Sequence, residues 1–147
     1  MKVYLSGIVH GSESSHDIHN QAYREQIKNA LSAKYKNVTV FSPVDKDGPK
    51  EIEDHGEAEK KFFEMIQQAL MSDLIIAYLP AASMGSAIEI WEAYKNSKPV
   101  VIISPLKQNW TVRFLSTVVC KDLGEFEAYV ASGKLDDLVL DRYEKRD

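Results

Sequence analysis

The stretch 72–105 constrains the fold more than any other part of the sequence, because it contains two short apolar runs with a helical segment between them. The runs at 73–79 and 99–104 are almost continuously apolar, a pattern typical of parallel strands that are covered on both faces. The helix predicted over 85–95 connects them in a right-handed crossover. Ligands of such sheets bind at the carboxyl ends of the strands, so we expect a site at the loop 80–86.

The remaining segments extend this unit into one alternating pattern of strands and helices. The other predicted elements are a strand at 2–8, a helix at 17–36, a strand at 37–41, a helix at 57–71 and two C-terminal helices near 126–130 and 135–143. The segment 111–119 is ambiguous between a short helix and a strand, and 42–56 is predicted to be a long loop. We therefore predict one domain over 1–147 with a doubly wound α/β fold, a mainly parallel sheet of four to five strands with helices on both faces.

Apolar residues at helical spacing predict the faces that two of these helices bury. In the helix at 17–36 the apolar face consists of Tyr23, Ile27, Ala30 and Leu31. In the helix at 57–71 the residues expected to be buried are Phe62, Phe63, Ile66, Ala69 and Leu70.

The composition limits the kinds of partner. The formal net charge is −4, whereas a protein that binds a nucleic acid polymer needs basic surface. No apolar run is long enough to span a membrane, and the first residues resemble a strand more than a signal peptide. Cys120 is the single cysteine, so no disulfide forms within the chain. We expect a cytoplasmic protein with no cofactor and with neither a membrane nor a nucleic acid polymer as partner.

Several common sites of α/β proteins are absent from the sequence. It contains no G-x-x-x-x-G-K-[ST] phosphate loop, no G-x-G-x-x-G dinucleotide motif and no G-x-S-x-G nucleophile elbow. The four histidines lie mostly in polar segments, without cysteines or carboxylates that would complete a ligand set: His10, His16, His19 and His55. We therefore predict no metal site.

What remains is a carboxylate, Glu89, behind a loop of small residues at the start of the predicted helix 85–95. A helix start offers free N–H groups and a positive dipole end, which can hold a phosphate or a hydroxyl group. A carboxylate beside a sugar can attack the anomeric carbon, leave again in a second step and stabilise an oxocarbenium-like transition state. A structural alternative is a capping box, in which Ser86 caps the helix and Glu89 bonds back to the Ser86 N–H.

Three segments of the chain form a recognisable combination. They are Tyr4-Leu5-Ser6-Gly7, Ser72-Asp73 and Ser83-Met84-Gly85-Ser86-Ala87-Ile88-Glu89, with a weaker match at Arg113-Phe114-Leu115-Ser116. Together they resemble the nucleoside 2-deoxyribosyltransferase superfamily, which includes the 2'-deoxynucleoside 5'-monophosphate N-hydrolases. The resemblance implies an enzyme that hydrolyses or transfers the N-glycosidic bond of a 2'-deoxynucleoside or its 5'-monophosphate. It also implies that no cofactor or metal is needed and that the chain forms a homodimer or a larger homo-oligomer.

The resemblance implies roles for individual residues. Glu89 would be the nucleophile that forms a covalent deoxyribosyl intermediate, and the Tyr4 hydroxyl would lie within hydrogen-bond reach and orient it. The residues implied in substrate binding are Gly7 and His10 after the first strand, Ser83 and Gly85 beside the sugar or phosphate, and Ser116, which matches a serine that reaches the phosphate of a neighbouring subunit. Structural alternatives are a core role for Tyr4 and a turn role for the residues at the helix start.

The sequence departs from the family pattern at three positions. Met65 stands where the family usually carries Asp, and Ile8 and His10 stand where the hydrolases carry serine and arginine. The transferases usually carry Asp or Asn six residues before the nucleophile, where this chain has Ser83, which favours the hydrolase branch. Met65 favours an alternative function, a non-catalytic nucleotide or nucleotide-sugar binding module on the same fold.

Overall fold

The computed structural model describes residues 1–9, 20–45 and 54–144, and its centre is a five-stranded sheet in the strand order β2-β1-β3-β4-β5. All neighbouring strands run parallel. The strands are β1 (Lys2–Gly7), β2 (Thr39–Phe41), β3 (Leu74–Tyr78), β4 (Val100–Ile103) and β5 (Val118–Cys120). The prediction of a doubly wound α/β fold on a parallel sheet is confirmed.

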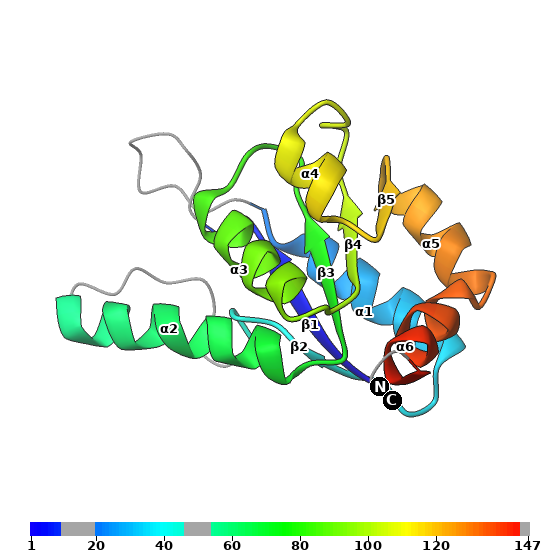
Figure 1. Ribbon diagram of the computed structural model, residues 1–147, viewed down its shortest axis with the longest axis horizontal. Coiled ribbons are helices and arrows are strands. Elements are labelled where there is room, and N and C mark those ends of the chain that lie inside the picture. The colour runs from blue at the N-terminus through cyan, green and yellow to red at the C-terminus, as the bar shows by residue number, and fades with distance from the viewer. Residues whose placement is uncertain (10–19, 46–53, 145–147) are drawn as a thin grey trace.

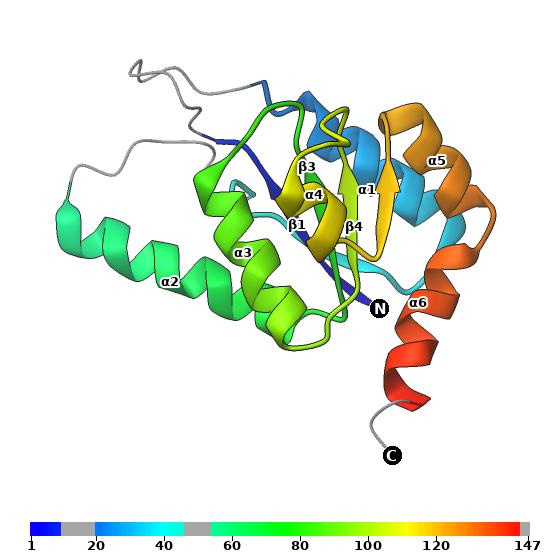
Figure 2. The same cartoon turned by 45° about the horizontal axis from the view of Figure 1, so that its top comes forward.

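Helices cover both faces of the sheet (Figures 1 and 2). They are α1 (Ala22–Lys34), α2 (His55–Met71), α3 (Met84–Lys95), α4 (Trp110–Leu115), α5 (Leu123–Ala131) and α6 (Lys134–Glu144). Helices α1, α5 and α6 share a hydrophobic cluster with one face of the sheet, and α2, α3 and α4 share a second cluster with the other face. Because α1 follows β1 and α3 follows β3, both helices begin at the carboxyl end of the sheet, on opposite faces.

The alternation of side chains along each strand explains these two clusters. In β1, Val3 and Leu5 lie in the cluster under α1, whereas Tyr4 lies in the cluster under α3. In β3, Ile76 and Ile75 divide between the clusters in the same way. All five side chains are fully buried, and burying a large aliphatic side chain stabilises a fold by about 1.5–3 kcal/mol. Burial on both faces is therefore the reason for the continuous apolar runs in the sequence.

Strand β2 ends earlier than the strand beside it. Its pairing with β1 runs from Lys2↔Thr39 to Tyr4↔Phe41, whereas the pairing of β1 with β3 continues to Gly7↔Tyr78. From Leu5 onward, β1 is therefore paired with β3 on one side and has passed the end of β2 on the other.

The predicted elements are found with shifted ends. Helix α1 begins at Ala22, and the start predicted for it at residue 17 lies outside the described residues. Helix α2 begins at His55, because the Asp54 side chain accepts a hydrogen bond from the Glu57 N–H at 2.7 Å and caps the helix before its predicted start. The ambiguous segment 111–119 contains both a short helix, α4, and a strand, β5.

The prediction that α2 buries Phe62 and Phe63 is wrong. These side chains are 42% and 56% exposed, whereas Ile66 and Ala69, nearer the end of the helix, are buried and Leu70 is partly buried. The cause is the placement of the helix, since the first half of α2 extends past the start of α3 (Figure 1). Apolar spacing identifies a helix face but not how far along the helix its neighbour reaches.

Candidate active site

Helix α3 begins with a cap that differs from the capping box described above. Ser83 is the N-cap residue, and its Oγ accepts a hydrogen bond from the Ser86 N–H at 3.3 Å. Ser86 therefore lies inside the first turn and does not cap the helix. The capping-box interpretation of Glu89 is wrong, and the carboxylate makes its contacts elsewhere.

The Glu89 carboxylate accepts hydrogen bonds from two side chains of β1. Tyr4 Oη donates to Oε1 at 2.6 Å, and Ser6 Oγ donates to Oε2 at 2.5 Å. Tyr4 and Ser6 are two residues apart, so both side chains lie on the same face of β1. Both are fully buried, whereas Glu89 is only partly buried. Each carboxylate oxygen thus has one hydroxyl donor, and the two bonds fix the orientation of the group.

The surroundings of Glu89 shift its pKa in opposite directions. Burial raises the pKa of Glu89, while the hydrogen bonds from Ser6 and Tyr4 and the charge of Arg24 lower it, and the net direction is upward. Burial and the neighbouring Glu89 charge raise the pKa of Tyr4, so Tyr4 keeps its proton and remains a donor. The site is therefore a carboxylate held by neutral donors, an arrangement that can act as a nucleophile.

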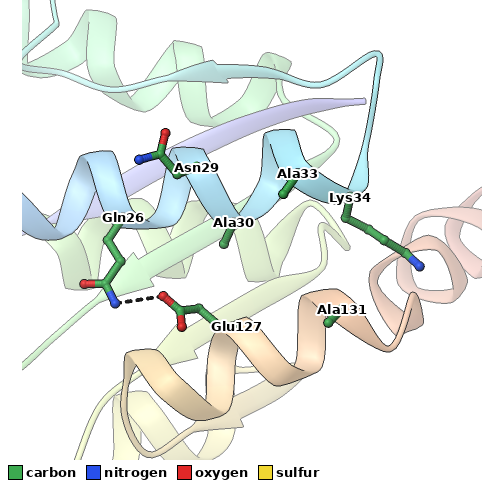
Figure 3. A pocket seen from close by; sticks show the side chains of 7 residues that line it. All are labelled: Gln26, Asn29, Ala30, Ala33, Lys34, Glu127 and Ala131. Atoms are coloured by element: carbon green, nitrogen blue, oxygen red, sulfur yellow. Dashed lines mark hydrogen bonds between the residues drawn. The ribbon is translucent and has the colours of Figure 1, made fainter.

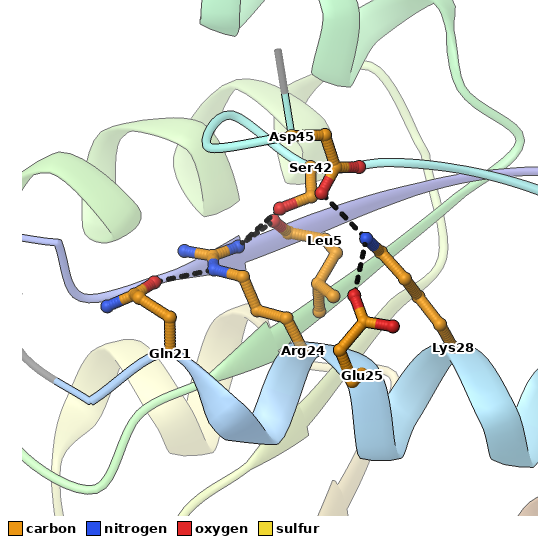
Figure 4. Close-up of polar contacts among 7 residues, drawn as sticks. All are labelled: Leu5, Gln21, Arg24, Glu25, Lys28, Ser42 and Asp45. Atoms are coloured by element: carbon orange, nitrogen blue, oxygen red, sulfur yellow. Dashed lines mark hydrogen bonds and ion pairs between the residues drawn. The ribbon is translucent and has the colours of Figure 1, made fainter. Parts of the chain in front are cut away.

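A buried arginine, Arg24 of α1, lies at the end of β1. It is 2% exposed. Its Nη1 donates to the Leu5 carbonyl at 2.9 Å and to Ser42 Oγ at 3.0 Å, and its Nε donates to Gln21 Oε1 at 2.7 Å (Figure 4). These bonds hold the positive charge of Arg24 in one place beside the strand that supplies both donors to Glu89.

Sequence analysis missed both Ser6 and Arg24. The alternation along a strand could have identified Ser6, because it follows Tyr4 by two residues. The signal for Arg24 was a cation directly after Tyr23, at the edge of the apolar face of α1. That position is equally compatible with an exposed cation, so only the tertiary structure identifies Arg24 as buried.

Three of the predicted substrate-binding residues lie at the ends of helices. Ser83 caps α3, and Gly85 in the first turn has open space where a side chain would stand. Ser116 follows α4, and its Oγ donates to the Val112 carbonyl at 2.6 Å. His10 lies outside the described residues. A contact of any of these residues with substrate stays a prediction.

Gly7 is required by the packing of α1 on the end of β1. A Cβ atom at this position would lie 2.0 Å from Tyr23 Oη and 2.8 Å from Tyr23 Cζ. The Tyr23 ring in turn stacks on the ring of Tyr78, with centroids 4.3 Å apart. A side chain of α1 therefore fills the space beside Gly7, and contact of Gly7 with a substrate stays a prediction.

No group of three or more His, Cys, Asp or Glu side chains that could hold a metal ion is found within 1–9, 20–45 and 54–144. The helices described in these ranges include none with the length and hydrophobicity needed to cross a membrane. Met65 is partly buried and packs against the cluster that contains Tyr4. An apolar contact thus occupies the position where the superfamily usually carries Asp.

A hollow of about 610 Å³ lies between α1 and α5, on the face of the sheet opposite α3 (Figure 3). It is lined by Gln26, Asn29, Ala30, Ala33, Lys34, Glu127 and Ala131. At one end, Gln26 Nε2 donates to Glu127 Oε1 at 2.8 Å. None of the predicted site residues lines this hollow, so it is not the site expected at the loop 80–86 in front of Glu89.

Five parallel strands in the order 2-1-3-4-5, with a carboxylate on the helix that follows β3, define a doubly wound α/β protein with a candidate site at the carboxyl end of its sheet. No protein-family model matches the chain, and no curated protein matches it in sequence.

Two of the solved structures that are similar to this chain have the same fold. A 2-deoxyribosyltransferase of Bacillus psychrosaccharolyticus is similar with a TM-score of 0.64 and 21% sequence identity, and the match covers 88% of this chain and 96% of that chain. A conserved protein of Enterococcus faecalis is similar with a TM-score of 0.66 and 17% identity, covering 89% and 97% of the two chains. The fold expected from the resemblance to the nucleoside 2-deoxyribosyltransferase superfamily is thereby confirmed.

Proposed function

We propose that the protein is an enzyme of the nucleoside 2-deoxyribosyltransferase superfamily that hydrolyses or transfers the N-glycosidic bond of 2'-deoxynucleosides or their 5'-monophosphates. The observation that carries the proposal is the partly buried Glu89 carboxylate, held on both oxygens by Tyr4 and Ser6. It lies at the carboxyl end of the sheet, where ligands bind in this class of fold. The fold shared with a 2-deoxyribosyltransferase supports this class of substrate.

The proposed reaction has two displacements at C1' of the sugar. An electron pair of ionised Glu89 forms a bond to C1' as the bond from C1' to the base nitrogen breaks. The base leaves with the electron pair of the broken bond and takes a proton from solvent. The resulting glycosyl ester is attacked at C1' by water or a second base, which loses a proton while the electron pair returns to Glu89. Two inversions give net retention. The Tyr4 and Ser6 hydroxyls orient the carboxylate for the first step and stabilise its charge in the second.

The proposed site also includes Gly7 and His10, as the resemblance implies, and three further residues. Ser83 and Gly85 lie at the N-terminal end of α3, where N–H groups can bind a sugar hydroxyl or a phosphate. Ser116 would contact the phosphate bound to a neighbouring subunit, as the resemblance implies.

We also propose that the chain assembles into a homodimer or a larger homo-oligomer through the face formed by α2, α3 and α4. The exposed large apolar side chains on these three helices are Phe62, Phe63, Met71, Met84, Ile88, Trp91, Tyr94, Trp110 and Phe114. Helix α3 contacts both α2 and α4, and exposed apolar side chains gathered on adjacent helices are typical of interfaces between subunits.

The alternative function is a non-catalytic nucleotide or nucleotide-sugar binding module. Met65 favours it, because an apolar side chain cannot donate a proton to the leaving base or bind a sugar hydroxyl. Binding without cleavage would distinguish this alternative from the enzyme.

The test is incubation with a panel of deoxynucleosides, ribonucleosides and their 5'-monophosphates, with free base measured by chromatography. The parent should release base, and Glu89→Ala and Glu89→Gln should each lose at least about a hundredfold in rate, which corresponds to ~3 kcal/mol of barrier. Glu92→Gln on the same helix is the matched control, since Glu92 pairs with Lys95 at 2.6 Å. Base release that is equal in parent and both Glu89 variants would remove Glu89 from the mechanism.

A further inference from the structure

The end of β2 leaves one backbone acceptor of β1 to be satisfied by a side chain. Pairing with β2 ends at Tyr4↔Phe41, and the carbonyl of the next residue, Leu5, accepts from Arg24 Nη1 at 2.9 Å. The same nitrogen donates to Ser42 Oγ, directly after the last residue of β2. The guanidinium thus continues the hydrogen bonding of the sheet where β2 stops (Figure 4). It reaches this place from α1 at the carboxyl end of the strand that carries Tyr4 and Ser6.

The hydrogen bonds of Arg24 do not neutralise its positive charge. The bonds at Nε and Nη1 all go to neutral acceptors, and Nη2 is buried without a partner in the part of the chain that the structure describes. The nearby carboxylates Glu25 and Asp45 bond to Lys28 instead, at 3.1 and 2.6 Å (Figure 4). A buried cation without a counter-charge is unfavourable, so the arrangement needs a negative group close by.

The Glu89 carboxylate is a negative group near Arg24 among the described residues, since its donors Tyr4 and Ser6 flank Leu5, whose carbonyl accepts from Arg24. Within 1–9, 20–45 and 54–144, this carboxylate accepts hydrogen bonds from two neutral hydroxyls, and the ionisable groups that act on it are Tyr4 of β1 and Arg24 and Tyr23 of α1. Of these, only Arg24 is positively charged. The Tyr23 ring lies 5.0 Å from Arg24 Cζ and stacks on Tyr78 of β3, so aromatic side chains exclude water from the arginine.

We propose that Arg24 is a positioning residue for Glu89: its buried guanidinium is a fixed positive charge that favours the ionised carboxylate and so opposes the effect of burial. Arg24 does not itself contact the sugar in this role. It acts from the opposite side of β1, at a place where water or a mobile surface cation could not provide a constant charge. The inference deepens the proposed function and rests on it for the nucleophilic role of Glu89.

Direct titration of Glu89 tests the proposal without any substrate. The side-chain carboxyl ¹³C resonances of the labelled protein are followed against pH, and Glu89 is assigned by its absence from Glu89→Gln. The pKa of Glu89 should be higher in Arg24→Met than in the parent and should stay close to the parent value in Arg24→Lys. Lys28→Met removes a cation four residues away on the same helix and should leave it unchanged. An unchanged Glu89 pKa in Arg24→Met overturns the proposal.

The pH dependence of kcat/KM then tests whether the charge of Arg24 affects the reaction. In Arg24→Met the acid limb of kcat/KM should move to higher pH, as expected for loss of an opposite charge. The lost rate should return as the pH rises. A limb that stays in place although the Glu89 pKa moves would overturn the positioning role. If no nucleoside is cleaved by the parent, the proposed function fails while the NMR titration still decides whether Arg24 sets the charge of Glu89.

A second measurement covers the case in which Arg24→Met does not fold, as thermal melts would show. Coupling between two charges is reciprocal, so the guanidinium ¹⁵N resonances of Arg24 in the parent should shift with pH at the pKa of Glu89. The shift should vanish in Glu89→Gln. Resonances that do not titrate in the parent would overturn the proposal.

Discussion

Replacing Gly7 by alanine tests how tightly α1 packs on the end of β1. The new Cβ would lie 2.0 Å from Tyr23 Oη and 2.8 Å from Tyr23 Cζ, both well inside van der Waals contact. Tyr23 cannot easily move away, because it is 7% exposed and stacked on Tyr78. Positive φ angles are found in the described residues at Ser97 and Gly133 and not at Gly7, so alanine meets a side chain there and not backbone strain.

The expected cost follows from two opposing effects. Overpacking a well-packed site costs about 1–3 kcal/mol, while replacing glycine with alanine stabilises by about 0.4–1 kcal/mol through the unfolded chain. Gly7→Ala should therefore lower the free energy of unfolding by up to about 2.6 kcal/mol, and each kcal/mol lowers Tm by about 2–4 °C in a chain of this size. Urea denaturation followed by circular dichroism measures this loss.

Tyr23→Phe provides the second half of a double-mutant cycle. The Tyr23 hydroxyl is buried and has no hydrogen-bond partner among the described residues, so its removal should change stability little or increase it. It also deletes the atom nearest to the new methyl group. In the Tyr23→Phe background, Gly7→Ala should therefore cost less, with a coupling energy on the order of 1 kcal/mol. An equal cost of Gly7→Ala in both backgrounds would refute the reasoning.

Three further predictions concern Glu89 and the exposed face. Because burial raises the pKa of Glu89, the native state binds more protons than the unfolded state between the two pKa values, and this group lowers stability as pH rises through that window. The Tm of Glu89→Gln relative to that of the parent should therefore increase as pH rises through the window, and a constant difference in Tm would contradict this. Ser6→Ala removes a hydrogen bond to a charged group, worth about 1.5–3 kcal/mol, and should move the acid limb of the pH–rate profile for base release upward, whereas an unmoved profile would exclude Ser6 from the site. Trp91→Glu should reduce the molar mass measured by light scattering to that of a monomer. Leu140→Glu, at an exposed site on α6, is the control and should not change the molar mass. A parent that is itself monomeric would contradict the proposed assembly.

The sequence by itself determined the architecture of this protein. The apolar runs at 73–79 and 99–104 predicted buried parallel strands, because only strands covered on both faces lack polar positions. The resemblance also placed the Tyr4 hydroxyl within reach of Glu89, and the structure confirms that contact at 2.6 Å. These features depend on local patterns and on short motifs, and both can be read along one chain.

Only the tertiary structure decided how the candidate site is supported. The Ser6 bond to Glu89, the burial of Arg24 and the fit of Tyr23 against Gly7 join β1 to helices on opposite faces of the sheet. The exposure of Phe62 depends in the same way on where α2 extends past α3. Such contacts depend on distances of a few ångströms between elements far apart in the sequence, and those distances are set by the packing of the whole core.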